Sequence, residues 1–300
     1  MTFAIATSIQ DALVALSGGA RPIAGGSDLV VAARHGKTAL PHDLVAIDRL
    51  AELVHIDSSA SGLTIGALTS HAALIASDVV CRDDSALADA SALVGSPATR
   101  NVGTLGGNVM NASPAMDTGA PLLVFDASVE LRSVNASRTV AIADLWTGPG
   151  TTVASPEELC VAITVPARPA NSGSAYVRLE YRRAMEIAVV GAAANVVLDG
   201  DGGIASISVA LTAVAPTIIA VRDLQAAVHG RPVDATTLAT VAELAAAQAS
   251  PISDVRASDA YRRHCVGVMA RRAVEAAARR ATGETIAVPV NRAVGIGAAR

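Results

Sequence analysis

Hydrophobic positions near the start of the chain first follow a helical spacing and then form short strand-like runs. After Ser8, apolar residues recur every three or four positions, which predicts a helix that ends at Gly18 and Gly19: Ile9, Leu13, Val14 and Leu16. The positions that follow predict a strand, a helix and a second strand, at 22–24, 28–33 and 44–47. Residues 1–52 are therefore expected to form a small α/β subdomain.

The next part of the chain predicts a second α/β subdomain over residues 53–170. Two runs around a polar turn predict a hairpin, one largely apolar stretch predicts a helix and two β-rich runs predict strands: 53–56 with 63–66, 85–95, 128–133 and 158–165. His71 is expected to open a further helix, as a capping or solvated residue. A link rich in Pro, Gly and Ser at 166–174 marks a boundary.

Beyond that link the pattern predicts a C-terminal domain over 175–285, followed by a tail at 286–300. Its first half has β-rich runs on both sides of a glycine-rich turn at 200–203, which is typical of an antiparallel hairpin. From Leu224 onward the spacing is mostly helical, with two clear stretches at 238–249 and 257–281. An α+β organisation is expected, in which residues 1–170 form the first domain.

Composition limits the possible functions. Apolar residues make up 51% and charged residues 17% of the 300 positions, which is typical of a globular protein. A net charge of −4 and only 2% aromatic residues argue against nucleic-acid binding. We see no signal-peptide pattern and no apolar run of the roughly 18 residues that a membrane helix needs, so a cytoplasmic protein is expected.

Cysteines and histidines show no spacing that would hold a metal. Cys81, Cys160 and Cys265 are scattered, whereas an iron–sulfur cluster normally takes four thiolates. The six histidines are dispersed as well. No metal site is therefore expected on this chain.

Two glycine pairs carry the strongest candidate chemistry. One lies in 24–29, Ala-Gly-Gly-Ser-Asp-Leu, and the other in 103–108, Gly-Thr-Leu-Gly-Gly-Asn. Glycine lets the backbone approach a bulky anion, and consecutive N–H groups form anion-binding nests. Two nests, each beside a hydroxyl, predict a diphosphate held from two sides. Asn108 and Asp117 could then bond the hydroxyls of an attached ribitol or ribose, which makes the site one for a dinucleotide.

Simpler interpretations of these residues stay open. The first glycine pair also fits an ordinary strand–turn–helix that Ser27 or Asp28 caps, and Asp117 fits a surface carboxylate that caps a turn. A nicotinamide-binding Rossmann domain is disfavoured, because Gly25-Gly26 stands where the G-x-G-x-x-G pattern should be.

The chain resembles the FAD-binding medium subunit of the molybdenum hydroxylases, the family of xanthine dehydrogenase and aerobic carbon monoxide dehydrogenase. The resemblance rests on both glycine segments, on Asn111-Ala112-Ser113-Pro114 with Asp117, and on the run from Asp254 to Arg263. It implies an α+β fold: a vanillyl-alcohol-oxidase (PCMH) type FAD-binding domain of two α/β subdomains, followed by a C-terminal domain with an antiparallel sheet and helices.

The resemblance also implies which residues bind FAD. These positions are Ile23, Ala24, Gly25, Gly26, Ser27, Asp28, Leu29, Val94, Thr104, Leu105, Gly106, Gly107, Asn108, Asp117, Cys160 and Arg178. Val94 stands where some relatives have an aromatic residue over the adenine. Cys160 stands where relatives usually have Leu or Ile near the isoalloxazine, and Arg178 where some have a basic residue near the flavin ring.

The resemblance implies an electron-transfer role within a larger complex. Molybdopterin and two [2Fe–2S] clusters are expected on a large and a small partner subunit, in a dimer of heterotrimers. Electrons would pass from the clusters through FAD to an external acceptor, and no catalytic residue for the substrate is expected here. The alternatives are an autonomous FAD oxidoreductase, for which Tyr181 and Glu186 are the obvious acid–base candidates, and a non-catalytic nucleotide-binding scaffold.

Overall fold

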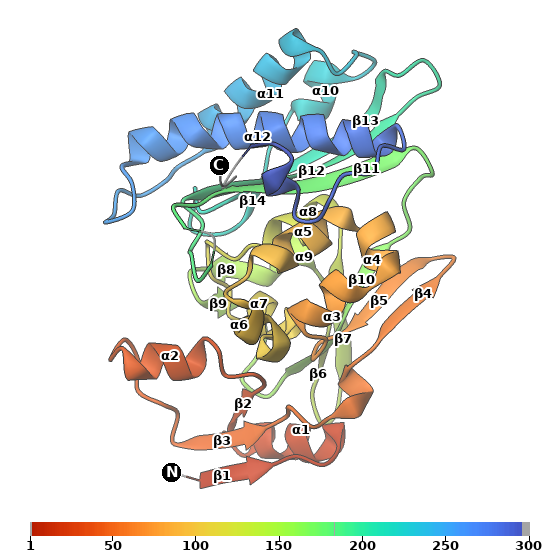
Figure 1. Ribbon diagram of the computed structural model, residues 1–300. Helices are drawn as coiled ribbons and strands as arrows, with labels where there is room; N and C mark the ends of the chain where they lie inside the picture. Colours follow the sequence, from red (N-terminus) through yellow and green to blue (C-terminus); the bar gives the residue numbers. More distant parts are fainter. Residues whose placement is uncertain (1, 183, 296–300) are drawn as a thin grey trace.

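A computed structural model describes residues 2–182 and 184–295. Three lobes follow one another from the bottom to the top of Figure 1: a small N-terminal lobe, a middle lobe, and a C-terminal lobe with a long helix on its outer side. Each lobe has its own cluster of buried apolar side chains. Helices accompany sheets that are mainly antiparallel, so the α+β organisation is observed.

The N-terminal lobe is a three-stranded parallel sheet in the order β1-β3-β2 with two helices. Its elements are β1 (Thr2–Ile5), α1 (Ile9–Ser17), β2 (Arg21–Ile23), α2 (Leu29–Arg34) and β3 (Asp43–Ala46). The Ser8 hydroxyl accepts a hydrogen bond from the Asp11 N–H and begins α1, as predicted. The strand β1 was not predicted, and all four of its residues are exposed.

A strand from the middle lobe completes the N-terminal core. Leu13 and Leu16 of α1 pack with Val45 of β3 and with Leu159 and Val161, which belong to β10 (Leu159–Pro166). Burying such side chains contributes about 1.5–3 kcal/mol each. The two lobes are therefore joined through β10.

The middle lobe is built on a five-stranded antiparallel sheet in the order β4-β5-β10-β6-β7. Its other strands are β4 (Ile56–Ser59), β5 (Gly62–Gly66), β6 (Ser128–Arg132), β7 (Ser137–Ala141), and the separate pair β8 (Trp146–Gly148) and β9 (Thr151–Thr152). Its helices are η1 (Ala51–Leu53), α3 (His71–Ala76), α4 (Asp78–Asp83), α5 (Ser85–Leu93), α6 (Pro97–Val102), α7 (Leu105–Met110), α8 (Gly119–Val124) and α9 (Ile142–Leu145). The first hairpin strand begins at Ile56 and not at 53, because the chain makes a 3₁₀ turn before it.

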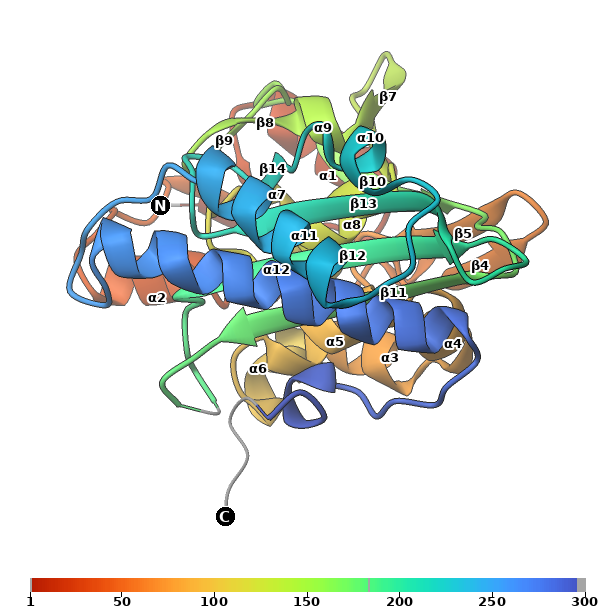
Figure 2. The same cartoon turned by 90° about the horizontal axis from the view of Figure 1, so that it is seen from above.

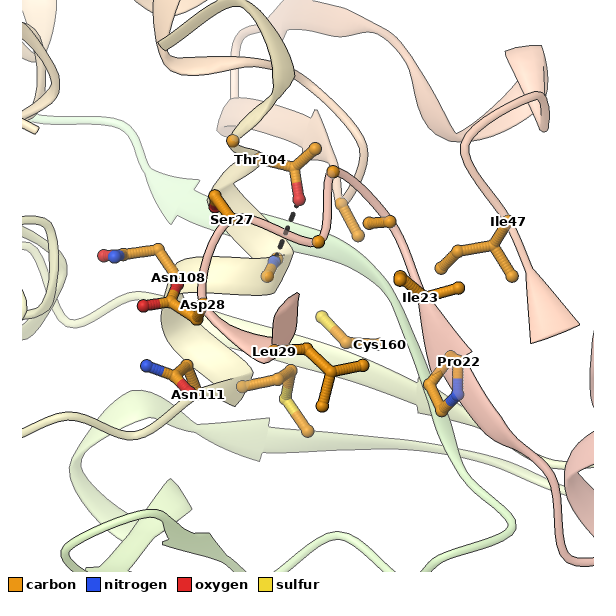
Figure 3. A pocket seen from close by; sticks show the side chains of 18 of the residues that line it. Pro22, Ile23, Ser27, Asp28, Leu29, Ile47, Thr104, Asn108, Asn111 and Cys160 are labelled. Atoms are coloured by element: carbon orange, nitrogen blue, oxygen red, sulfur yellow. Dashed lines mark hydrogen bonds between the residues drawn. The ribbon is translucent and has the colours of Figure 1, made fainter. Parts of the chain in front are cut away.

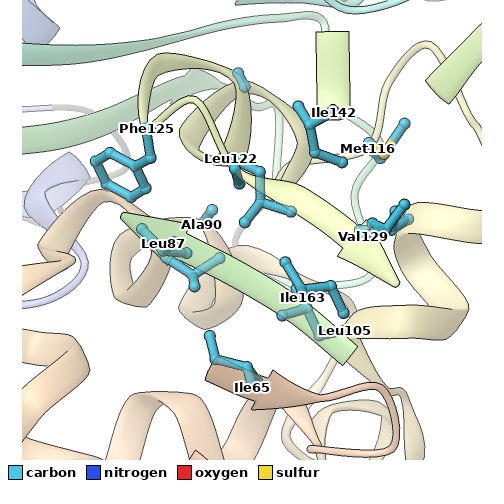
Figure 4. Packing of buried hydrophobic residues seen from close by; sticks show 14 of the residues in the cluster. Ile65, Leu87, Ala90, Leu105, Met116, Leu122, Phe125, Val129, Ile142 and Ile163 are labelled. Carbon is cyan, nitrogen blue, oxygen red and sulfur yellow. The ribbon is translucent and has the colours of Figure 1, made fainter. Parts of the chain in front are cut away.

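The core of the middle lobe lies between this sheet and its helices. Ile65 and Ile163 come from neighbouring strands and face Leu87 of α5 and Leu105 of α7 (Figure 4). None of these four side chains is exposed to solvent. Leu105 therefore belongs to this core.

The C-terminal lobe is a four-stranded antiparallel sheet covered by helices on its outer face (Figures 1 and 2). Its elements are β11 (Ser172–Leu179), β12 (Val190–Leu198), β13 (Ile204–Thr212), β14 (Ile219–Ala220), α10 (Leu224–Val228), α11 (Ala235–Gln248), α12 (Asp259–Ala281) and η2 (Val290–Arg292). The inner face of the sheet rests on α5 and α8 of the middle lobe.

The run around Asp254 that contributes to the family resemblance has a structural role. The Asp254 carboxylate accepts hydrogen bonds from the backbone N–H groups of Arg256 and Ala257 and from the Arg262 guanidinium. These hydrogen bonds hold the pKa of Asp254 at about 2, against the opposing effect of desolvation. Arg262 is 3% exposed and also donates to the Val189 carbonyl, so the motif fixes the start of α12 against the sheet.

Candidate cofactor site

A cavity of about 420 Å³ lies where the N-terminal and middle lobes meet (Figure 3). Both glycine segments and the start of β10 form its walls. Thirteen of the sixteen predicted FAD-binding residues line it: Ile23, Ala24, Gly25, Gly26, Ser27, Asp28, Leu29, Val94, Thr104, Gly106, Gly107, Asn108 and Cys160. Residues far apart in sequence thus meet at one site.

The two glycine segments are in direct contact at Gly25. An ideal Cβ placed on Gly25 would lie 1.8 Å from the Val102 carbonyl oxygen and 2.5 Å from its carbon. The next residue, Gly26, has φ +65°, a conformation that side-chain-bearing residues rarely adopt. Both glycines are therefore required by the backbone path of the cavity wall.

The second glycine segment was predicted to form an anion-binding nest, and most of it is the helix α7. Thr104 is the N-cap, and its hydroxyl accepts a hydrogen bond from the Gly107 N–H at 3.0 Å (Figure 3). Gly106 packs against Ala67, whose Cβ would lie 2.6 Å from an added methyl group. An added Cβ on Gly107 would meet only the Thr104 Oγ1, at 2.9 Å. Gly106 is required for packing, whereas Gly107 borders the cavity.

Polar side chains gather on one side of the cavity. Figure 3 shows Asp28, Asn108 and Asn111 close together, from the start of α2 and from α7. Asp28 makes no side-chain cap bond, and burial raises its pKa. The Asn108 oxygen accepts from the Thr118 hydroxyl at 2.6 Å, which orients the Asn108 amide N–H₂ group away from Thr118.

Asp117 and Arg178 do not line the cavity but pair with each other in the interior. The Arg178 Nη1 donates to the Asp117 Oδ2 at 2.7 Å, and its Nη2 donates to the Glu180 Oε2 at 2.6 Å. The Tyr176 hydroxyl donates to the other Asp117 oxygen at 2.7 Å. Burial raises the pKa of Asp117, and the charge of Arg178 opposes that rise.

Arg100 lies between this buried network and the cavity. Arg100 donates to the Val94 carbonyl at 2.9 Å, and burial, together with the nearby charge of Arg178, lowers the pKa of Arg100. Val94 is a cavity residue without an aromatic ring. Leu105, the third predicted residue outside the lining, is fully buried in the core of the middle lobe.

Cys160 lines the cavity and is 5% exposed. Burial, with a smaller effect of the Glu130 charge, raises the pKa of its thiol to about 12. Roughly one thiol in 10⁵ would then be ionised at neutral pH. The thiol is an apolar wall group and not a nucleophile.

We expect Cys160 to react with Ellman's reagent at pH 7 at least ~100-fold more slowly in the folded chain than in the unfolded chain, because the thiolate is the reacting species. The slow reaction is assigned to Cys160 if it is absent from the Cys160→Ala variant. All three thiols react in guanidinium chloride, which is the control. Fast modification of Cys160 in the folded chain would contradict its burial.

Sequence reasoning missed several polar residues of the cavity, among them Asn111 and His71. Asn111 belongs to the segment that carries the family resemblance, and its position three residues after Asn108 on α7 was the available signal. His71 was expected to be a capping or solvated residue. This expectation was wrong, because α3 packs beneath the second glycine segment and His71 is only 1% exposed.

The described ranges, 2–182 and 184–295, contain neither a cluster of metal ligands nor a membrane-spanning helix. They contain no cluster of three or more His, Cys, Asp or Glu residues that could hold a metal ion. Within the same ranges, no helix is long and apolar enough to cross a membrane.

Two family models match the chain, one after the other. Residues 1–168 match the model described as "FAD binding domain in molybdopterin dehydrogenase". Residues 175–277 match the model described as "CO dehydrogenase flavoprotein C-terminal domain".

Relatives are similar over nearly the whole chain. The carbon monoxide dehydrogenase medium chain of Afipia carboxidovorans is 36% identical over 278 residues, covering 91% of this chain and 95% of that protein. The xanthine dehydrogenase FAD-binding subunit of Escherichia coli O157:H7 is 32% identical over 283 residues, covering 93% and 96%. A chain of the reconstituted CO dehydrogenase from Oligotropha carboxidovorans superposes with a TM-score of 0.89 at 34% identity, covering 93% and 98%.

Proposed function

The chain belongs to the family of FAD-binding medium subunits of molybdenum hydroxylases, and on this premise we propose that it carries electrons from [2Fe–2S] clusters of a partner chain through FAD to an external acceptor. The family resemblance and the α+β FAD-binding fold predicted from the sequence are confirmed. The protein is an oxidoreductase subunit.

One observation supports FAD as the ligand of the cavity: two glycine segments, distant in sequence, form adjoining parts of its wall. Gly25 permits the close approach of the segments, and Gly107 leaves space where a side chain would project. Bound FAD would supply a redox group that accepts and passes on electrons. The residues that border the cavity thus suit a cofactor with a central diphosphate.

We propose that backbone groups of 23–29 and 104–108 hold the diphosphate, and that Val94 and Cys160 contact the ring systems. Asp28 and Asn108 offer an acceptor and a donor to the hydroxyls of the cofactor. Contacts of Asp117 with the ribitol or ribose and of Arg178 with the flavin stay predictions. The hydrogen bonds of Asp117 to Tyr176 and Arg178 support an indirect role, in which this buried network sets the charge and the side-chain positions behind the cavity wall.

The partners follow from the relatives, which are subunits of multi-subunit dehydrogenases. A large molybdopterin-binding subunit and a small subunit with two [2Fe–2S] clusters would complete the enzyme. We further propose a dimer of heterotrimers in the cytoplasm. The proposed domains are 1–170, with subdomains of about 1–52 and 53–170, and 175–285, with a tail at 286–300.

The two acid–base candidates of the autonomous-oxidoreductase alternative lie outside the cavity. Tyr181 is 59% exposed and donates to the Arg256 carbonyl at 2.7 Å. The Glu186 carboxylate lies 3.5 Å from the Arg182 guanidinium. Neither residue lines the cavity, so neither is placed to act on a substrate held beside a flavin there.

We expect the purified chain to show a flavin absorption spectrum, or to acquire one when FAD is added, and to release free FAD on denaturation. The same chain alone should hydroxylate no purine, aldehyde, N-heterocycle or carbon monoxide, because that chemistry belongs to the molybdenum subunit. The measurement is the spectrum before and after unfolding, with turnover assayed in parallel. A chain that takes up no FAD, or that turns over substrate alone, would refute the proposed function.

A further inference from the structure

His71 opens α3 and lies in the wall of the cofactor cavity. Its backbone N–H donates to the Gly103 carbonyl at 3.1 Å, which fixes the residue beneath the second glycine segment. The side chain is 1% exposed. The titratable imidazole of His71 is therefore buried beside the glycine residues of the cavity wall.

The imidazole lies where the two glycine segments meet. An ideal Cβ on Gly103 would be 3.4 Å from the His71 Cδ2 and 3.6 Å from the Ser27 hydroxyl oxygen. The ring and the hydroxyl thus border the same point of the second segment. Ser27 belongs to the first segment, so His71 is close to both proposed diphosphate-binding elements.

The hydrogen bonding of the imidazole is incomplete. Among the described residues, its one hydrogen bond joins Nδ1 to the Ser91 hydroxyl of α5 at 3.5 Å, the long limit for such a bond. Nearly all buried polar atoms have a good partner, and an imidazole has two nitrogens to satisfy. The Nε2 is therefore available to a ligand.

The charges around His71 favour its neutral form while the cavity holds no anion. Burial, with the positive charge of Arg100 on α6, lowers the pKa of His71 to about 4. The other charged side chains of the cavity lining are Arg21, Asp28 and Glu158, and Glu158 is paired with Arg138 at 2.6 Å. A diphosphate dianion beside the ring would reverse this balance, because a nearby negative charge favours imidazolium.

We propose that His71 binds the diphosphate of FAD directly, taking up a proton as the cofactor binds and donating a hydrogen bond from Nε2 to a phosphate oxygen. This inference rests on the proposed function. It assigns to a buried histidine a binding role that the glycine segments alone do not provide.

The sign of the pH dependence follows from linkage. His71 is neutral in the free chain above about pH 4, and it is protonated in the complex up to its raised pKa. Between these two values the complex holds more protons than the free chain. FAD affinity should therefore increase as the pH falls, by up to ~10-fold per pH unit for one proton.

The test is calorimetric titration of the FAD-free full chain with FAD, in buffers of different ionisation enthalpy at one pH near 6.5. The slope of heat against ionisation enthalpy gives the number of protons taken up. Wild type should take up a large fraction of one proton, and His71→Asn should lose that uptake and bind FAD ~10-fold or more weakly, since a charge-assisted bond is lost. His264→Asn, at an exposed position of α12, is the matched control and should match wild type.

Two further arms separate the alternatives. Asp28→Asn tests a second titratable group of the cavity, and loss of proton uptake in that variant with retention in His71→Asn would overturn the proposal. Riboflavin, which lacks phosphate, should cause no proton uptake in wild type. Binding of no FAD by wild type would instead refute the proposed function.

A measurement on the wild-type chain covers the case in which His71→Asn fails to fold. In the ¹³C-histidine NMR spectrum, the six histidines can be titrated with and without FAD. One buried histidine should have a pKa near 4 in the free chain that rises to about 6.5 or above with FAD. The proposal is wrong if no histidine pKa rises when FAD binds.

Discussion

Gly25→Ala should leave the purified chain almost without FAD. The new methyl carbon would stand 1.8 Å from the Val102 carbonyl oxygen and 2.5 Å from the Val102 carbonyl carbon. Because these two Val102 atoms belong to the backbone, no side-chain rotation relieves the contact. The two glycine segments must separate, which opens the cavity wall. Overpacking of this kind costs about 1–3 kcal/mol. If the cofactor-bound state bears that cost, the Kd for FAD rises by ~10–100-fold.

Two further glycine variants serve as comparisons for Gly25→Ala. Gly200→Ala is the control, since an added Cβ there meets nothing within 4 Å. Gly107→Val should weaken FAD binding severely, because the side chain would project toward the cavity, and its Cβ, 2.9 Å from the Thr104 hydroxyl, should also disturb the N-cap of α7. The measurements are flavin content per chain and the Kd for FAD by fluorescence. Full flavin content in Gly25→Ala and Gly107→Val would show that the cofactor binds elsewhere.

Arg178→Met should be among the most destabilising single substitutions in this chain. Arg178 is fully buried and holds Asp117 at 2.7 Å and Glu180 at 2.6 Å. Methionine fills a similar volume but leaves two buried carboxylates without their cation. Removing one partner from a buried ion pair costs about 3–5 kcal/mol. Urea denaturation of wild type and variant measures the difference in the free energy of unfolding.

The loss should depend on pH. Burial raises the pKa of Asp117, and in Arg178→Met the cation that opposes this rise is gone, so the unfolded state binds fewer protons than the folded state. The destabilisation therefore decreases as the pH falls through the raised pKa of Asp117. The exposed pair of Arg82 and Asp83 provides the control, and Arg82→Met should change stability by less than about 1 kcal/mol. A stable Arg178→Met variant at neutral pH would contradict the charge network.

Most of the candidate site could be predicted from short sequence motifs. Glycine pairs beside hydroxyl residues are visible without a structure, and the prediction that both serve one site agrees with their shared cavity wall. The helix α7 was hidden by the same residues, since two glycines in six positions lower helix propensity. Packing of Gly106 on Ala67 and the Thr104 cap stabilise this helix, and both depend on the folded chain.

Pairings across the fold could not be predicted in this way. Arg178 is 61 residues from Asp117, and nothing near either residue indicates that they are partners. His71 has the local pattern of a solvated helix start, and its burial comes from residues distant in sequence, such as Ser91 of α5 and Gly103. The strand β1 exposes all of its residues, so the usual alternation of buried and exposed side chains is absent.

The contribution of β10 to two lobes has a consequence for biosynthesis. Leu159 and Val161 complete the core under α1, and Cys160 between them forms part of the cavity wall. The ribosome makes the first glycine segment early, but that segment cannot acquire its final surroundings until β10 has emerged from the exit tunnel. Capture of FAD must therefore follow synthesis of the whole middle lobe. Nascent chains that stall before Leu159 would present the uncovered apolar side of α1 to chaperones.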